Sequence, residues 1–169
     1  SIAEYMDIML GPEVGAYRYM LCRTGYPVPA SVTVDVRSKE RTLVLDDGAV
    51  EVWGLGVEHA NTPAVAYRVD TAFGSLAFSG DQNQARKEEF TEFVSDVDIL
   101  VMHFPNDEME DPGHAFWHNN PSTIGEIARD ARVGKLVLSH FMEYTLNNMR
   151  ASVAEVRKSF AGPIELATD

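Results

Sequence analysis

Two mostly apolar runs, residues 97–102 and 135–139, constrain the fold of this chain more than any other feature. Neither run alternates apolar and polar residues as a half-buried strand does, and such runs are typical of strands covered on both faces of a parallel sheet. Helical patterns and a last strand alternate with them, over residues 86–94, 121–132, about 146–160 and 164–167. This α-β-α-β-α-β order predicts an α/β layered domain.

The residues before position 80 have the period of strands instead. Apolar and polar residues alternate from Val32 to Val36, and the Asp46–Gly48 turn joins two further β-rich runs into a hairpin. The expected strands of this meander cover residues 32–36, 43–45, 49–57, 64–69 and 75–78. Residues 1–30 do not fit the pattern. They include a predicted short helix over 2–10 and are interpreted as an insertion or variable segment that forms a pocket wall, an oligomer contact or simple packing.

The composition excludes several classes of protein. Fourteen Lys and Arg against 26 Asp and Glu give a net charge of −12, which disfavours binding to nucleic acid. The single cysteine, Cys22, excludes an internal disulfide framework and a Cys-rich zinc finger. No apolar run approaches the roughly 18 residues of a membrane span. We therefore expect a soluble protein without a membrane partner, and favour the cytoplasm over the periplasm.

Residues suited to bind metal follow three of the expected strands. His59, Asp81 and His140 each lie just past an apolar strand, where layered α/β folds build their sites. Two imidazoles and a carboxylate suit zinc, manganese or iron, and Asp81 has two oxygens with which to bridge two ions. Taken singly, a histidine at a strand end is more often structural, and Asp81 also suits a turn or helix N-cap.

Three further histidines need separate interpretations. His103 follows the same strand-end pattern, and we favour a structural role for it. His114 and His118 belong to the long polar loop over residues 105–118, and loops of that length are usually functional.

The ordered set of these segments resembles the metallo-β-lactamase-fold hydrolases. The resemblance rests on Val57–Val69 with His59, Phe78–Asp81, Val97–His103, the stretch from His118 to Thr123, and Leu136–Phe141 with His140. It covers roughly residues 42–169 and is strongest to the branch of ribonuclease Z, the PhnP-type phosphodiesterases and the arylsulfatase-like proteins. The fold it implies is a four-layer αββα sandwich, of which residues 31–169 are the C-terminal half.

The resemblance also implies roles for the matched residues. His59 corresponds to a ligand of the first metal, Asp81 to the carboxylate that bridges both metals, and His140 to a ligand of the second. His118 corresponds to a histidine that binds no metal and contacts the leaving group or a substrate oxygen, where it can donate a proton or stabilise charge. The implied cofactor is a pair of ions, with zinc favoured over manganese or iron, and the implied nucleophile is a hydroxide that bridges them.

One departure from the family is large. The His-x-His-x-Asp-His motif is absent, and with it four of the seven expected ligands. Either this chain is the C-terminal half of a longer protein, with the N-terminal half possibly a separate chain, or it is a noncatalytic binding or scaffold domain that has lost its metals. We favour the first, and expect an isolated half to form homo-oligomers through its uncovered sheet.

The spacing of the site residues bears on the substrate. His59 and Asp81 are 22 positions apart, which leaves room for one hairpin but not for the long tRNA-gripping insertion of bacterial-type ribonuclease Z. A small anionic ester remains, either a phosphodiester or a sulfate ester, with a lactone or carboxylic ester still open.

Overall fold

The structure is a computed structural model that describes residues 4, 8, 9, 34–37, 39–108 and 116–168. The chain divides into two compact units, residues 1–35 and 36–169. In the first unit Glu4, Ile8 and Met9 have helical backbone, as predicted for residues 2–10. The other residues of that helix, the rest of the segment 1–30 and His114 lie outside the described residues.

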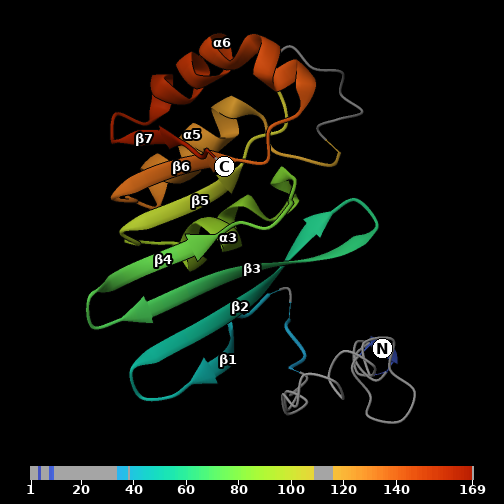
Figure 1. Cartoon of the computed structure of the whole chain (residues 1–169), viewed down its shortest axis with the longest axis vertical. Coiled ribbons are helices and arrows are strands. Elements are labelled where there is room, and N and C mark those ends of the chain that lie inside the picture. Colours follow the sequence, from blue (N-terminus) through green and yellow to red (C-terminus); the bar gives the residue numbers. More distant parts are fainter. Residues whose placement is uncertain (1–3, 5–7, 10–33, 38, 109–115, 169) are drawn as a thin grey trace, which may run out of the picture. The chain divides into compact units, whose positions relative to one another are not determined.

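The described residues of the second unit form one seven-stranded sheet with helices, as the α/β prediction required (Figure 1). The strands lie in chain order across the sheet: β1 (Thr42–Asp46), β2 (Val50–His59), β3 (Thr62–Thr71), β4 (Gly74–Phe78), β5 (Ile99–His103), β6 (Lys135–Ser139) and β7 (Ile164–Leu166). The helices are η1 (Gln84–Arg86), α3 (Lys87–Phe93), α5 (Pro121–Asp130) and α6 (Glu143–Ser159). Pairing is antiparallel from β1 to β4 and parallel from β4 to β7.

Short turns make the antiparallel half. Asp47 accepts hydrogen bonds from the backbone N–H groups of Ala49 and Val50, and Gly48 has φ +84°, so the predicted Asp-Gly hairpin is confirmed. Strands β2 and β3 are joined by Ala60 and Asn61 alone, since His59 pairs with Thr62. This two-residue turn holds Ala60 at φ +48°, a left-handed conformation that L residues seldom adopt.

The strand predicted over residues 32–36 is wrong for residues 34–36, which have no regular structure. The physical reason is that Val36 packs with its side chain against the sheet: its methyl carbons lie 3.0 and 3.1 Å from where Gly54 would carry a Cβ. One backbone hydrogen bond, from Gly56 N–H to the Arg37 carbonyl at 2.8 Å, ties this stretch to β2. At Val36 the apolar residue of the alternating pattern is a side chain packed on the sheet and not part of a strand within it.

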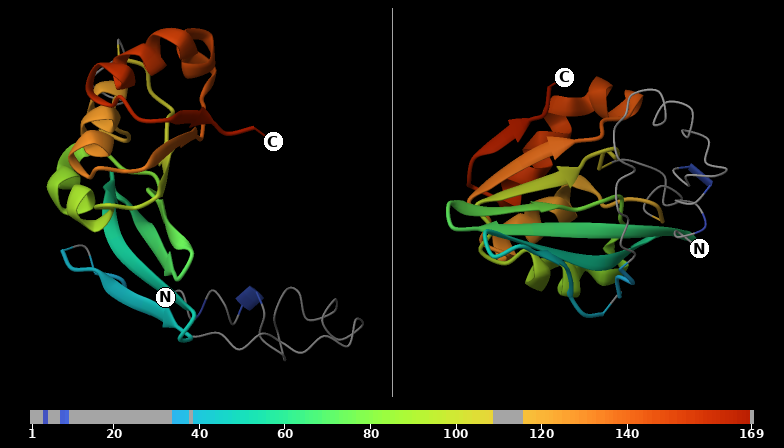
Figure 2. Two further views of the ribbon diagram at one scale, coloured as in Figure 1. Left: turned by 90° about the vertical axis from the view of Figure 1, so that its left-hand side faces the viewer. Right: turned by 60° about the horizontal axis from the view of Figure 1, so that its bottom comes forward.

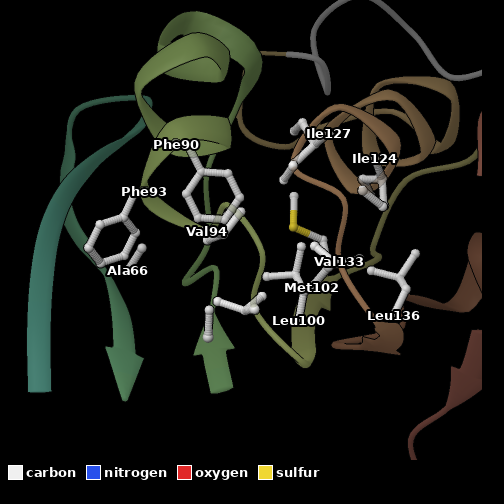
Figure 3. Close-up of a cluster of buried hydrophobic side chains, with 14 of the residues drawn as sticks. Ala66, Phe90, Phe93, Val94, Leu100, Met102, Ile124, Ile127, Val133 and Leu136 are labelled. Atoms are coloured by element: carbon white, nitrogen blue, oxygen red, sulfur yellow. The ribbon is translucent and has the colours of Figure 1, made fainter. Parts of the chain in front are cut away.

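Helices η1, α3, α5 and α6 of the second unit lie on one face of the sheet (Figure 2). The connections between parallel strands are right-handed crossovers. Because β4 to β7 follow one another across the sheet in one direction, each crossover places its helix on the same side. The core lies between these layers (Figure 3). Its fully buried members include Ala66 of β3, Phe90 of α3, Leu100 and Met102 of β5, Ile124 and Ile127 of α5 and Leu136 of β6.

None of η1, α3, α5 and α6 covers the opposite face of the sheet, which carries a row of apolar side chains (Figure 2). The register places Tyr67 beside Phe78, Phe78 beside Val101 and Val101 beside Val137. Tyr67 and Phe78 are 41% and 43% exposed, which is high for aromatic residues in the middle of a sheet. The described residues therefore supply two layers, one of helices and one of strands. We call the row Tyr67, Phe78, Val101 and Val137 the open-face row.

Within the described ranges, no helix combines the length and the apolar character that crossing a membrane requires.

Candidate active site

The topology of the sheet gathers the predicted site residues at one edge. Strands β2, β4, β5 and β6 all run in the same direction, so their carboxyl ends meet at a single edge. His59 is the last residue of β2, Asp81 follows β4, His103 is the last residue of β5, and His140 directly follows β6. Residues that are 81 positions apart in the sequence thereby become neighbours.

A pocket of about 440 Å³ lies at this edge. It is lined by His59, Asp81, Asn106, Trp117, His118, His140, Met142 and Tyr144. Asp81 Oδ1 lies 3.8 Å from His140 Nε2. The ring of His118 lies close to both other imidazoles, with its centroid 4.9 Å from that of His59 and 5.9 Å from that of His140. The structure thus brings together all four residues singled out from the sequence.

The backbone at two of the strand ends has unusual conformations. His140 has φ +58°, and such left-handed non-glycine residues concentrate at functional sites. Gly80 has φ +59°, and a Cβ there would lie 2.5 Å from the Val65 carbonyl oxygen. Only glycine lets the chain turn this close to β3, and Asp81 is delivered to the pocket by that turn.

Comparisons with known proteins identify the fold. No protein-family model matches the chain, and no curated protein sequence matches it. Among solved structures, the metallo-β-lactamase fold protein YhfI from Bacillus subtilis superposes with a TM-score of 0.67 at 20% identity, over 90% of this chain and 60% of YhfI. This chain has the metallo-β-lactamase fold.

Two further structures show how widely that fold is shared. Human tRNase Z, short form, matches with a TM-score of 0.60 at 19% identity, over 78% of this chain and 45% of that protein. CmlA, a diiron β-hydroxylase from Streptomyces venezuelae, matches with a TM-score of 0.57 at 14% identity, over 91% of this chain and 36% of CmlA. The chain therefore spans at most about three fifths of the length of these metallo-β-lactamase-fold relatives.

His103 is a buried structural link in this version of the metallo-β-lactamase fold. The Asn119 backbone N–H donates to its Nε2 at 3.3 Å, so the ring proton lies on Nδ1, which donates to Ser79 Oγ at 3.1 Å. Ser79 Oγ in turn donates to the Gly80 carbonyl at 2.7 Å. Burial, with a smaller contribution from the neighbouring His118, lowers the pKa of His103 to about 3. The neutral ring ties the end of β4 to the loop that carries His118.

Side-chain amides that the sequence did not single out hold this loop. Asn106 Nδ2 donates to the His118 carbonyl at 3.3 Å, and Asn83 Nδ2 donates to the Phe116 carbonyl at 2.7 Å. Asn119 N–H also lies 3.0 Å from the Gln82 carbonyl. Gln82 and Asn83 directly follow Asp81 and are buried, so one segment delivers the carboxylate and anchors the loop of His118. The position of Gln82 and Asn83 directly after Asp81 could have indicated a role near the site. No feature of the sequence indicates such a role for Asn106.

The donors present fit part of a metal site of the metallo-β-lactamase fold. Within the described ranges, no three His, Cys, Asp or Glu side chains are grouped closely enough to hold an ion by themselves. Asp81 and His140 have donor atoms 3.8 Å apart, and His59 lines the same pocket, which gives two imidazoles and a carboxylate around it. This donor chemistry suits zinc, manganese or iron, provided that further ligands come from elsewhere.

Proposed function

We propose that this chain forms part of a metal-dependent hydrolase of small anionic esters, with a phosphodiester or a sulfate ester as substrate. One observation carries the proposal: His59, Asp81, His118 and His140, from four separate segments, line a single pocket at the carboxyl edge of the sheet. This polar cluster is half-buried beside the sheet and is not part of the apolar core. Its donor types are those of metal-assisted hydrolysis.

His59, Asp81 and His140 are the residues that would hold the metal ions. We expect two ions, zinc before manganese or iron, with Asp81 shared between them. When bound, such ions acidify a water molecule and neutralise negative charge on a substrate oxygen. The strained backbone of His140 supports this assignment, because strain persists where function selects a fixed side-chain direction.

His118 would act on the substrate and not on the metals. Its ring lies close to those of His59 and His140, and its backbone is fixed by the Asn106 amide. A histidine so placed can donate a proton to the leaving-group oxygen as the ester bond breaks. Holding the ring in place before the substrate arrives lowers the entropic cost of this step.

The open-face row is where we propose that the rest of the fold packs. The apolar side chains of Tyr67, Phe78, Val101 and Val137 would pair with a second sheet, which would also bring the four further ligands. This second sheet would come from a preceding segment or a separate chain. The greater length of YhfI supports this proposal. Without that sheet, the same row would favour association between copies of the chain.

The connections between His59 and Asp81 support a small substrate. Two-residue turns, 60–61 and 72–73, join β2 to β3 and β3 to β4. Strands β3 and β4 with these turns therefore fill nearly the whole sequence between His59 and Asp81. No arm extends from this interval to grip a large nucleic acid, and the net charge of −12 repels phosphate backbones. The likeness to tRNase Z therefore supports the fold and not a tRNA substrate.

Metal analysis separates this proposal from a noncatalytic binding or scaffold domain. The assembled protein should retain about two transition-metal equivalents after dialysis and should hydrolyse bis(4-nitrophenyl) phosphate or 4-nitrophenyl sulfate. Asp81→Asn and His140→Ala should lose both properties, whereas His118→Ala should lose turnover and keep its metal. Asp130→Asn, an exposed carboxylate at the end of α5, is the matched control and should change neither. Failure to retain any of the three metals would favour the scaffold.

A further inference from the structure

A second pocket, of about 390 Å³, lies beside α6 and shares no described lining residue with the candidate active site. It is lined by Asp107, Glu108, Asn148, Ala151, Ser152 and Glu155. The last four lie at steps of three and four positions along α6, so they share one face of that helix. Its volume is that of a small-molecule site and is far larger than a bare metal ion needs. We call these six residues the α6 pocket.

The described lining of the α6 pocket is acidic. Three of its side chains are carboxylates, and none of the described lining residues is basic. Glu155 pairs with the exposed Lys158 at 2.6 Å, whereas Glu108 accepts hydrogen bonds from two uncharged donors, the N–H and Oγ of Ser122. An excess of negative charge around one concave surface favours a positively charged ligand.

Ser152 gives an independent indication of a ligand. It is only 1% exposed, and its Oγ has no hydrogen-bond partner among the described residues. A hydroxyl within a helix ordinarily donates to the carbonyl four residues earlier, as Thr91 does to Lys87 at 2.6 Å. Buried polar atoms nearly always have partners, so an unpaired hydroxyl in the lining of a pocket indicates that a ligand completes it.

The arrangement of the acceptors suits an organic cation better than a metal ion. In the part of the chain that the structure describes, no three acidic, imidazole or thiol groups are close enough to hold a metal. A primary ammonium has three N–H donors that point in different directions, so it can bind acceptors that are spread around it. Ala151 and the methylene groups of the acidic side chains offer a short alkyl chain apolar surface.

We propose that the α6 pocket binds a primary alkylammonium ion, which is either a free amine or the side chain of a lysine. The ammonium group donates a hydrogen bond to Ser152 Oγ, and the carboxylates around it balance its charge. The proposal does not rest on the hydrolase function, because the α6 pocket contains none of the residues assigned to the metal ions or the substrate.

Calorimetric titration of the assembled protein at pH 7 tests this proposal. Butylamine is protonated at this pH, 1-butanol is its neutral counterpart, and Nα-acetyl-lysinamide presents a lysine side chain. We expect butylammonium to bind at least roughly tenfold more tightly than butanol. Tighter binding of acetyl-lysinamide would assign the pocket to a lysine side chain, and tighter binding of butylamine to a free amine. If neither ammonium ion binds, or if butanol binds equally well, the proposal is wrong.

Substitutions locate the binding. Ser152→Ala should weaken butylammonium binding roughly tenfold without lowering the thermal stability, because the hydroxyl has no described partner to lose. Glu155→Gln should weaken it several-fold. Glu89→Gln is the matched control, since Glu89 also pairs with a basic residue three positions away but lies outside the pocket.

Asp81→Asn separates the α6 pocket from the candidate active site. Butylammonium should bind this variant and the metal-free protein as it binds the metal-loaded protein, whatever the outcome of the metal analysis. Loss of binding in Asp81→Asn would place the amine in the candidate active site and overturn the proposal. Unchanged affinity in both Ser152→Ala and Glu155→Gln would overturn it as well.

Discussion

The helix-covered face of the sheet follows the expected residue patterning, whereas its carboxyl edge departs from it. On the covered face, residues such as Phe90, Leu100 and Ile127 are fully buried in apolar surroundings, as the patterning predicts. At the edge, His140 and Gly80 have left-handed backbone, His103 is a buried titratable group and Trp117 is exposed. Left-handed backbone also occurs at Asp96 and Arg132, before β5 and β6, but only at the carboxyl edge does it coincide with titratable side chains around a pocket.

Removing a core ring should produce the largest effect. Phe90→Ala leaves a cavity between α3 and the sheet and should lower the free energy of unfolding by about 3–5 kcal/mol. Urea denaturation measures the loss. Phe73→Ala, at a fully exposed residue of the β3–β4 turn, is the matched control and should cost less than about 0.5 kcal/mol. Similar losses for the two variants would contradict the assignment of the core.

Gly48 and Gly80, two of the three described glycines with positive φ, should respond differently to substitution by alanine. Gly80→Ala combines backbone strain with a clash against the Val65 carbonyl and should cost roughly 3 kcal/mol, together with a loss of zinc affinity as Asp81 moves. Gly48→Ala has open space around its Cβ and should cost about 1 kcal/mol through strain alone. Equal losses would mean that the close approach to β3 does not position the edge.

Acid should reveal the buried histidine. The folded pKa of His103, about 3, lies below its unfolded value of 6.5, so between these values the unfolded chain binds the extra proton. The free energy of unfolding is therefore at its full value above pH 6.5. It decreases as the pH is lowered, by roughly 2–3 kcal/mol at pH 4.5. Carboxylates such as Asp96, whose pKa Arg132 lowers from 3.8, respond only at lower pH.

The measurement is denaturation of metal-free protein between pH 7 and 4.5, beside His103→Gln. The variant should be less stable at pH 7 but should lose less stability on acidification. If the two proteins lost equal stability over this range, His103 would not be the group that titrates.

The smallest effect should have the opposite sign. Glycine accepts the φ of +58° at position 140, which relieves about 1–2 kcal/mol of strain and adds about 0.5–1 kcal/mol of chain entropy cost. His140→Gly should therefore stabilise the metal-free protein slightly while removing metal binding. His59→Gly, within regular β2, should destabilise it. Thermal unfolding compares the two, and a loss of stability in His140→Gly would show that its backbone is not strained.

Much of this architecture could be predicted from residue patterns. The apolar runs and helical periods specified the order of β4 to β7 and their helices, and right-handed crossovers then fix the side on which the helices lie. The same reasoning placed His59, Asp81 and His140 at strand ends. It erred at residues 34–36, because alternation reports which side chains are covered and not whether the backbone pairs with a neighbour.

The remainder of the site depends on distances that no local pattern records. Asn83 and Asn106 hold the loop of His118 through contacts 33 and 12 residues away. The left-handed turn at His140 has no glycine or asparagine to announce it, and Trp117 has the composition of an ordinary loop aromatic. These features result from packing between segments that are far apart in the sequence. The periodicity of apolar residues in a single sequence therefore does not predict them.

The two-residue link at Ala60 and Asn61 has a consequence for engineering. Lengthening it would displace His59, the residue just before it, so a segment inserted there would move His59 out of the pocket. Phe116 and Met142 are exposed and lie outside the strands, so their side chains can be changed without altering the register of the sheet.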